Sequence, residues 1–89
     1  MFEELHDAQE YLEKAMKLKN DGSNWYKYFY DMGNTEVEHA KRFYAMLNEH
    51  YQDLQTTPDL VAYMEPFKDS IDSWYLDEMT KIKILQDMF

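Results

Sequence analysis

Residues 24–54 read NWYKYFYDMGNTEVEHAKRFYAMLNEHYQDL and contain no proline. Large apolar residues recur through this stretch at the spacing of one helix face. The residues that define this face are Trp25, Phe29, Met32, Phe43, Leu47 and Leu54. The stretch therefore predicts one helix of about 30 residues and favours an all-α fold.

The residues before this stretch predict an earlier helix. Apolar residues recur at helical spacing from Leu5 to Met16. Gly22 suits a helix C-terminus, and Ser23 or Asn24 can cap the helix that follows. We therefore expect a first helix at about 3–19 and the long helix at about 24–54.

The residues after the stretch predict a third helix. Thr57 is a candidate cap, and Pro58 suits the first position of a helix. We expect this helix at about 58–88, with a kink or a break at Pro66, because proline cannot donate a backbone hydrogen bond. The length of 89 residues fits a single domain, residues 1–89.

Composition restricts the partners of the chain. The net charge of −9 argues against binding to nucleic acid or to an anionic membrane surface, and it favours cations. With no cysteine, any metal must be held by carboxylate, imidazole or water. A chain this short buries only a modest fraction of its surface, so we expect a homo-oligomer, either a dimer or larger. Residues 1–7 contain neither a basic nor an apolar run, which predicts a cytoplasmic protein.

Three polar residues lie on the apolar face of the long helix or at its edge. At about 100° per residue, Glu36 falls in the middle of that face, whereas His39 and His50 fall near its edge. A carboxylate that faces a core is costly unless it is paired, protonated or bound to metal. Glu36-x-x-His39 can present an oxygen and a nitrogen to one ion. This donor set predicts an iron-type site, with manganese or zinc as further possibilities.

Each of the other two helices also carries an acidic residue on its apolar side. Glu4 lies one turn before Ala8, and Tyr11, two turns after Glu4, could donate its phenol hydrogen to that carboxylate. Glu78 lies at the centre of the apolar stripe of the third helix. Phe67, Ile71, Trp74, Ile82, Leu85 and Phe89 define that stripe. We therefore predict Glu4, Glu36, His39 and Glu78 as metal ligands, supported by Tyr11 and His50.

Two motifs together resemble a known family. Glu4-x6-Tyr11 followed by Glu36-x-x-His39 is similar to the first half of the di-iron site of ferritin-like four-helix bundles. The surrounding residues resemble short ferritin-like proteins of bacteria and phages over residues 3–51. The resemblance implies a helical hairpin with a third helix, and oxidation of Fe(II) by a ferroxidase-type oxidoreductase. It also implies that Glu36 bridges two iron ions and that Glu4 and His39 are terminal ligands.

The chain departs from the family because it contains one Glu-x-x-His motif where the full bundle contains two. Two copies related by a two-fold axis would complete a four-helix core, or Glu78 could add a ligand within one chain. Other interpretations are that His39 is a hydrogen-bonded core histidine and that Glu78 pairs with Lys81. The alternative function is an acidic helical interaction module or virion-associated protein without metal chemistry. Mimicry of nucleic acid by the acidic surface is a third and weaker hypothesis.

Overall fold

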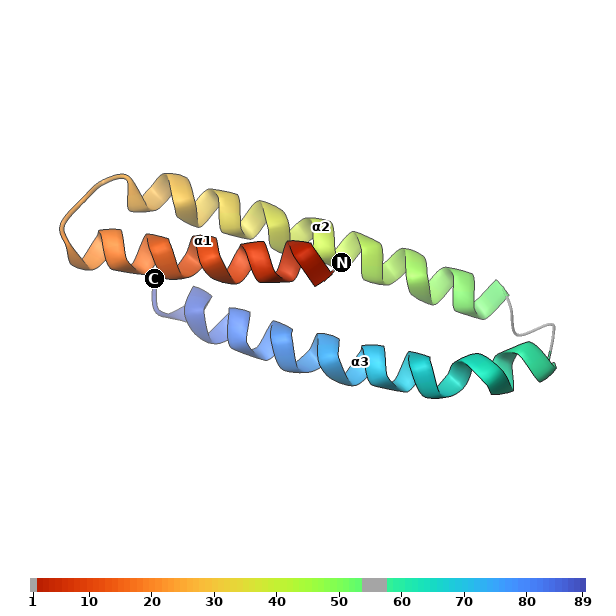
Figure 1. The fold of residues 1–89 in the computed structure, drawn as a ribbon. Coiled ribbons are helices and arrows are strands. Elements are labelled where there is room, and N and C mark those ends of the chain that lie inside the picture. Colours follow the sequence, from red (N-terminus) through yellow and green to blue (C-terminus); the bar gives the residue numbers. More distant parts are fainter. Residues whose placement is uncertain (1, 54–57) are drawn as a thin grey trace.

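The computed structural model describes residues 2–53 and 58–89, and these residues form three α-helices and no strand (Figure 1). α1 spans Phe2–Asn20, α2 spans Tyr26–Asp53 and α3 spans Pro58–Asp87. The all-α prediction is confirmed, and each helix begins and ends within two residues of its expected position. Pro66 lies inside α3, which continues through it as one helix. Of the two expected alternatives, a kink or a break, the break does not occur, because the helix tolerates the loss of the one backbone hydrogen bond that proline cannot donate.

The turn between α1 and α2 depends on Gly22. The backbone N–H of Ser23 donates to the carbonyl of Leu18 at 2.9 Å, and that of Gly22 donates to Lys19 at 3.1 Å. This pair of bonds is a Schellman motif, which requires a left-handed residue, and Gly22 has φ of +79°. Ser23 Oγ then accepts a hydrogen bond from the Trp25 N–H at 3.2 Å, so Ser23 helps to start the next helix.

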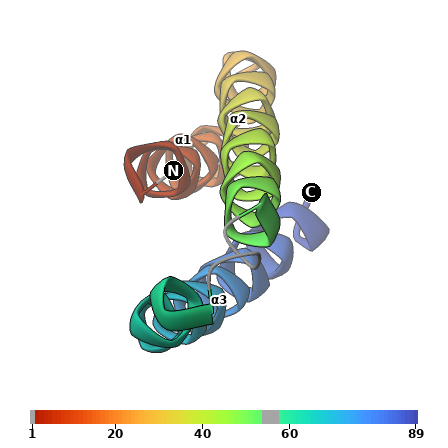
Figure 2. The same cartoon turned by 90° about the vertical axis from the view of Figure 1, so that its right-hand side faces the viewer.

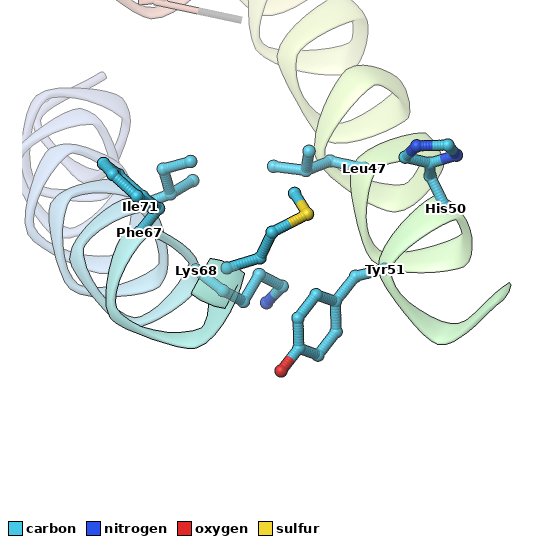
Figure 3. Close-up of a pocket in the computed structure, with 7 residues that line it drawn as sticks. Leu47, His50, Tyr51, Phe67, Lys68 and Ile71 are labelled. Carbon is cyan, nitrogen blue, oxygen red and sulfur yellow. The ribbon is translucent and has the colours of Figure 1, made fainter. Parts of the chain in front are cut away.

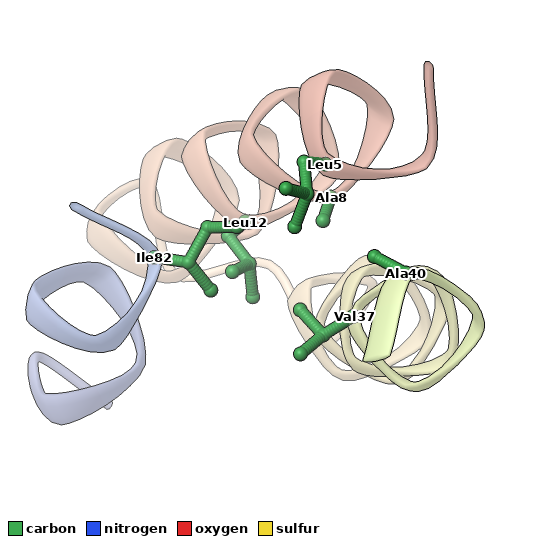
Figure 4. Close-up of a cluster of buried hydrophobic side chains, with 6 residues drawn as sticks. All are labelled: Leu5, Ala8, Leu12, Val37, Ala40 and Ile82. Atoms are coloured by element: carbon green, nitrogen blue, oxygen red, sulfur yellow. The ribbon is translucent and has the colours of Figure 1, made fainter. Parts of the chain in front are cut away.

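Small side chains bring α1 and α2 close together. The buried residues of α2 are Gly33, Val37 and Ala40. They face a fully buried row on α1 that consists of Leu5, Ala8 and Leu12 (Figure 4). A Cβ atom added to Gly33 would lie 2.9 Å from Leu12 Cγ, so only glycine allows this separation of the helices.

α3 completes the core from one side of the α1–α2 pair (Figure 2). Ile82 is fully buried against the α1–α2 core, and Trp74 and Leu85 pack around it. The ring of Phe89 lies 4.6 Å from that of Tyr30, and Lys19 Nζ donates to the Phe89 carbonyl at 3.3 Å. These contacts fix the end of α3 against both other helices.

The predicted buried face of α2 is wrong within one chain. Trp25 is 69% exposed and Phe43 is 47% exposed, while the residues that α1 covers lie about a quarter of a turn away. The large apolar residues are too bulky for so close a contact, and α1 packs instead on the small ones. Leu54, the last residue of the predicted face, lies outside the described residues.

The molecule is a rod with principal extents of 56 × 17 × 17 Å. The N-terminal end of α1 lies beside the middle of α2, so the end of α2 and the beginning of α3 extend beyond it (Figure 1). Within residues 2–53 and 58–89, no helix is both long enough and apolar enough to cross a membrane.

Candidate functional site

Glu36 and His39 lie together on α2, as their spacing predicts. His39 Nδ1 is 3.5 Å from Glu36 Oε1. The Glu36 side chain is 24% exposed and the His39 side chain is 47% exposed, so within one chain neither faces a closed core. Within one chain, His39 is therefore not a core histidine. Both side chains are available to a ligand that approaches from outside.

Glu4 comes from α1 to the same region. It is half-buried and shares a surface hollow with His39. The other residues of this hollow are Arg42, Phe43 and Met46. The one turn of α2 that presents Glu36 and His39 is thus flanked by a carboxylate from the neighbouring helix.

A second hollow contains Glu36 and the predicted supporting residue Tyr11. The other residues that line it are Tyr28, Asp31, Met32 and Thr35. The ring centroid of Tyr11 lies 6.4 Å from that of Phe29, which holds the phenol beside α2. The two hollows lie on one side of the hairpin, which we call the open face. It comprises Glu4 and Tyr11 of α1 and Tyr28, Met32, Glu36, His39, Phe43 and Met46 of α2.

Glu78 lies elsewhere, at the contact between α1 and α3. Its carboxylate accepts hydrogen bonds from Gln9 Nε2 and, at 3.1 Å, from Lys81 Nζ. Burial raises the pKa of Glu78, but these two hydrogen bonds outweigh it and leave the pKa below its ordinary value. Gln9 and Glu4 are separated by about 140° around α1. The predicted pairing with Lys81 is confirmed, and one chain does not bring Glu78 to Glu36 and His39.

His50 is also separate from the other predicted residues. It is exposed near the end of α2, about 16 Å along the helix from His39. It lines an apolar hollow between α2 and α3 (Figure 3), together with Leu47, Tyr51, Met64, Phe67, Lys68 and Ile71. Within the described part of the chain, no three side chains of His, Asp or Glu lie close enough together to hold a metal ion.

A polar cluster that was not predicted from the sequence joins α2 to α3. The Tyr44 hydroxyl donates to Asp72, and Lys68 Nζ lies 2.6 Å from Asp72 Oδ2. The rings of Tyr44 and Tyr75 stack with centroids 3.8 Å apart. Asp72 thus binds the neighbouring helix α2 through Tyr44. The i, i+4 spacing of Lys68 and Asp72 was the one available signal, and it does not reveal the tyrosines.

Electrostatics in this cluster favour an ionised carboxylate. Hydrogen bonds from Lys68 and then from Tyr44 lower the pKa of Asp72. Burial raises the pKa of Tyr44, and its hydrogen bond to Asp72 raises it further. The cluster is therefore a contact between helices in which every charged group has a partner.

Comparison of the chain with protein-family models, with curated proteins and with solved structures found no match.

Proposed function

We propose that this protein is a cytoplasmic, ferritin-like protein that binds iron-type metal ions through Glu4, Glu36 and His39. The observation that carries the proposal is the 3.5 Å contact between Glu36 and His39 on the open face, with Glu4 in the hollow beside them. Carboxylate oxygen and imidazole nitrogen are donors that suit iron or manganese, and zinc is also compatible with them.

One chain offers an incomplete set of ligands. Glu78 is engaged by Gln9 and Lys81 on another side of α1, which favours a second copy as the source of the remaining ligands. Two copies would contribute four carboxylates and two imidazoles, the donor set of a di-iron carboxylate protein. Two Fe(II) ions held by these residues would give electrons to oxygen or peroxide and would be oxidised to Fe(III). The residues of the chain would position the ions and exclude water around them.

The test is metal binding by the purified protein. We expect Mn(II), or Fe(II) without oxygen, to raise the melting temperature. A metal concentration one hundred times the Kd corresponds to about 2.7 kcal/mol of stabilisation. Glu36→Ala should abolish the response. Glu38→Ala is the matched control, because Glu38 is exposed on the same helix and its partner is Lys41.

An equal response in the two variants, or no response in the native protein, would contradict the metal site. Aerobic oxidation of Fe(II), compared between the native protein and Glu36→Ala, then tests the oxidoreductase activity. The mass of each variant in solution shows whether a lost response comes from the loss of a metal-binding side chain or from the loss of the oligomer.

A second candidate function is an acidic helical interaction module or virion-associated protein that keeps the fold without metal chemistry. The observation that favours it is the outer surface of α3, where Leu76 is 64% exposed and Ile84 is 59% exposed. A native protein that binds no metal but has a stable fold would support this function.

A further inference from the structure

α2 and α3 continue beyond the beginning of α1. Leu12 of α1 lies against Gly33 of α2, and the two helices are antiparallel, so α1 begins about level with Phe43 (Figure 1). α2 continues to Asp53, which is about 15 Å farther along its axis. This distance corresponds to about three turns of a helix, and over it two helices rather than three form the rod.

The apolar hollow between α2 and α3 lies in this two-helix stretch. We call it the end groove, and its apolar and aromatic lining consists of Leu47, His50, Tyr51, Met64, Phe67 and Ile71. In Figure 3, Leu47 of α2 faces Phe67 and Ile71 of α3 across it. Phe67 is 61% exposed. Among the described residues, none from α1 lines the groove, so its apolar surface is open to a partner.

Negative charge is concentrated at the same end of the rod. Residues 47–73 contain six acidic residues and one lysine, so they carry −5 of the net charge of −9. The lysine is Lys68, whose ammonium group is 2.6 Å from Asp72 Oδ2 and is therefore already paired. The rod is 17 Å across, so the acidic side chains of this end lie within about two Debye lengths of the groove. The end groove is thus apolar inside and acidic around it.

These features select the kind of partner. A second copy would bring the same negative charge to the groove, and like charges in one contact are repulsive. An extended peptide would leave its backbone N–H and C=O groups unpaired, because helices offer no free backbone edge. A helix satisfies its own backbone, and its apolar stripe can fill a groove between two other helices. Lysine or arginine on the flanks of that helix would complement the acidic surroundings.

We infer that the end groove binds a basic amphipathic helix of another protein, which continues the path of α1 between α2 and α3. The inference goes beyond the proposed function and does not depend on metal. The end groove is separate from the candidate metal ligands, because His50 lies about 16 Å along α2 from His39. Binding of the helix and binding of metal are therefore separate measurements.

The first experiment uses a model peptide. The probe is a fluorescently labelled peptide of about 14 residues, made of leucine and lysine with the leucines on one helix face. We expect fluorescence anisotropy in EDTA to show that the native protein binds it. A peptide with glutamate in place of lysine should not bind. A peptide with the same composition but no leucine face should bind at least about tenfold more weakly.

The second experiment separates docking from attraction by charge. Phe67→Glu removes an apolar side chain from the groove and adds a negative charge. Docking predicts that the Kd for the leucine–lysine peptide rises at least about tenfold, whereas attraction by charge alone predicts a lower Kd. Ile84→Glu is the matched control, because Ile84 is 59% exposed on the same helix and lies outside the groove. Its Kd should not rise, and circular dichroism checks that both variants are folded.

A third measurement locates the peptide on the native protein. Bound peptide should slow amide hydrogen exchange in 47–53 of α2 and 64–71 of α3, because it covers the two-helix end. Exchange in 12–20 of α1 should not change. This measurement requires no variant.

The outcomes separate this inference from the proposed function. No binding of the leucine–lysine peptide, an equal Kd in Phe67→Glu and Ile84→Glu, or protection outside the two-helix end overturns the inference. Self-association of the native protein that Phe67→Glu abolishes and Ile84→Glu does not would show that a second copy occupies the groove, which also overturns it. A protein that binds the peptide in the groove but shows no response to Mn(II) confirms this inference and contradicts only the proposed function.

Discussion

At the scale of single residues, Gly33 decides how closely α1 and α2 pack. A Cβ atom at this position would lie 2.9 Å and 3.0 Å from two carbons of Leu12 and 3.3 Å from the Ala8 carbonyl oxygen. Leu12 is fully buried and Ala8 O belongs to the backbone, so neither can move aside easily. Glycine thus lowers the helix propensity of α2 at this position, but it allows α1 and α2 to pack closely.

We therefore expect Gly33→Ala to destabilise the protein although alanine favours helix. The clash costs about 1–3 kcal/mol and the gain in propensity is about 1 kcal/mol, so the net loss should be on the order of 1 kcal/mol. Urea unfolding measures it. In the Gly33→Ala background, Leu12→Ala should cost less than it does alone, because it removes the clashing atoms. Additive losses would show that the two side chains do not meet.

At the scale of helices, the cluster of Tyr44, Lys68 and Asp72 holds α2 to α3 where α1 no longer lies between them. Its effect on stability depends on the charge of Asp72, whose pKa is lowered by Lys68 and then by Tyr44. A lowered pKa means that the folded state favours the ionised form. The stabilisation is therefore full above the ordinary pKa of 3.8 and is lost as the pH falls through the folded value.

We expect Asp72→Asn to lower the free energy of unfolding at pH 7 by at most about 1 kcal/mol, because the ion pair is partly exposed. The difference from the native protein should shrink as the pH falls below 3.8. Thermal unfolding across this range measures it. Asp69→Asn, at an exposed position of the same helix, is the control. A difference that stays constant at low pH would mean that charge is not the cause.

The helices themselves were predictable because their signals are local. Gly22 ends α1 and Pro58 begins α3 through backbone conformation alone, and both are visible in the sequence. The side of α2 that packs against α1 was not predictable in the same way. Large apolar residues dominate a helical wheel, whereas Gly33 and Ala40 matter because of the space they leave. Tyr44 and Asp72 could not be paired from sequence, since 28 positions separate them.

At the scale of the whole molecule, the candidate site could be predicted only in part. The i, i+3 spacing placed Glu36 beside His39, and the helical period placed Glu4 and Tyr11 on the side of α1 that borders them. Glu78 and His50 were predicted together with them because a helical wheel shows only the direction of a side chain. It does not show which helix lies next to that side chain or how far along the rod the side chain lies. Whether Glu36 and His39 bind metal remains a prediction, as does the ferritin-like family.

The unequal lengths of the helices determine which end of the rod unfolds locally. α1 has 19 residues, whereas α2 has 28 and α3 has 30, so one end of the molecule contains three helices and the other contains two. Amide hydrogens in 47–53 of α2 should therefore exchange with deuterium faster than those in 33–40. Mass spectrometry of peptides resolves the exchange of the two segments. Equal protection from exchange in both would mean that the whole chain unfolds as one unit. The end that contains two helices should thus unfold locally more often than the end that contains three.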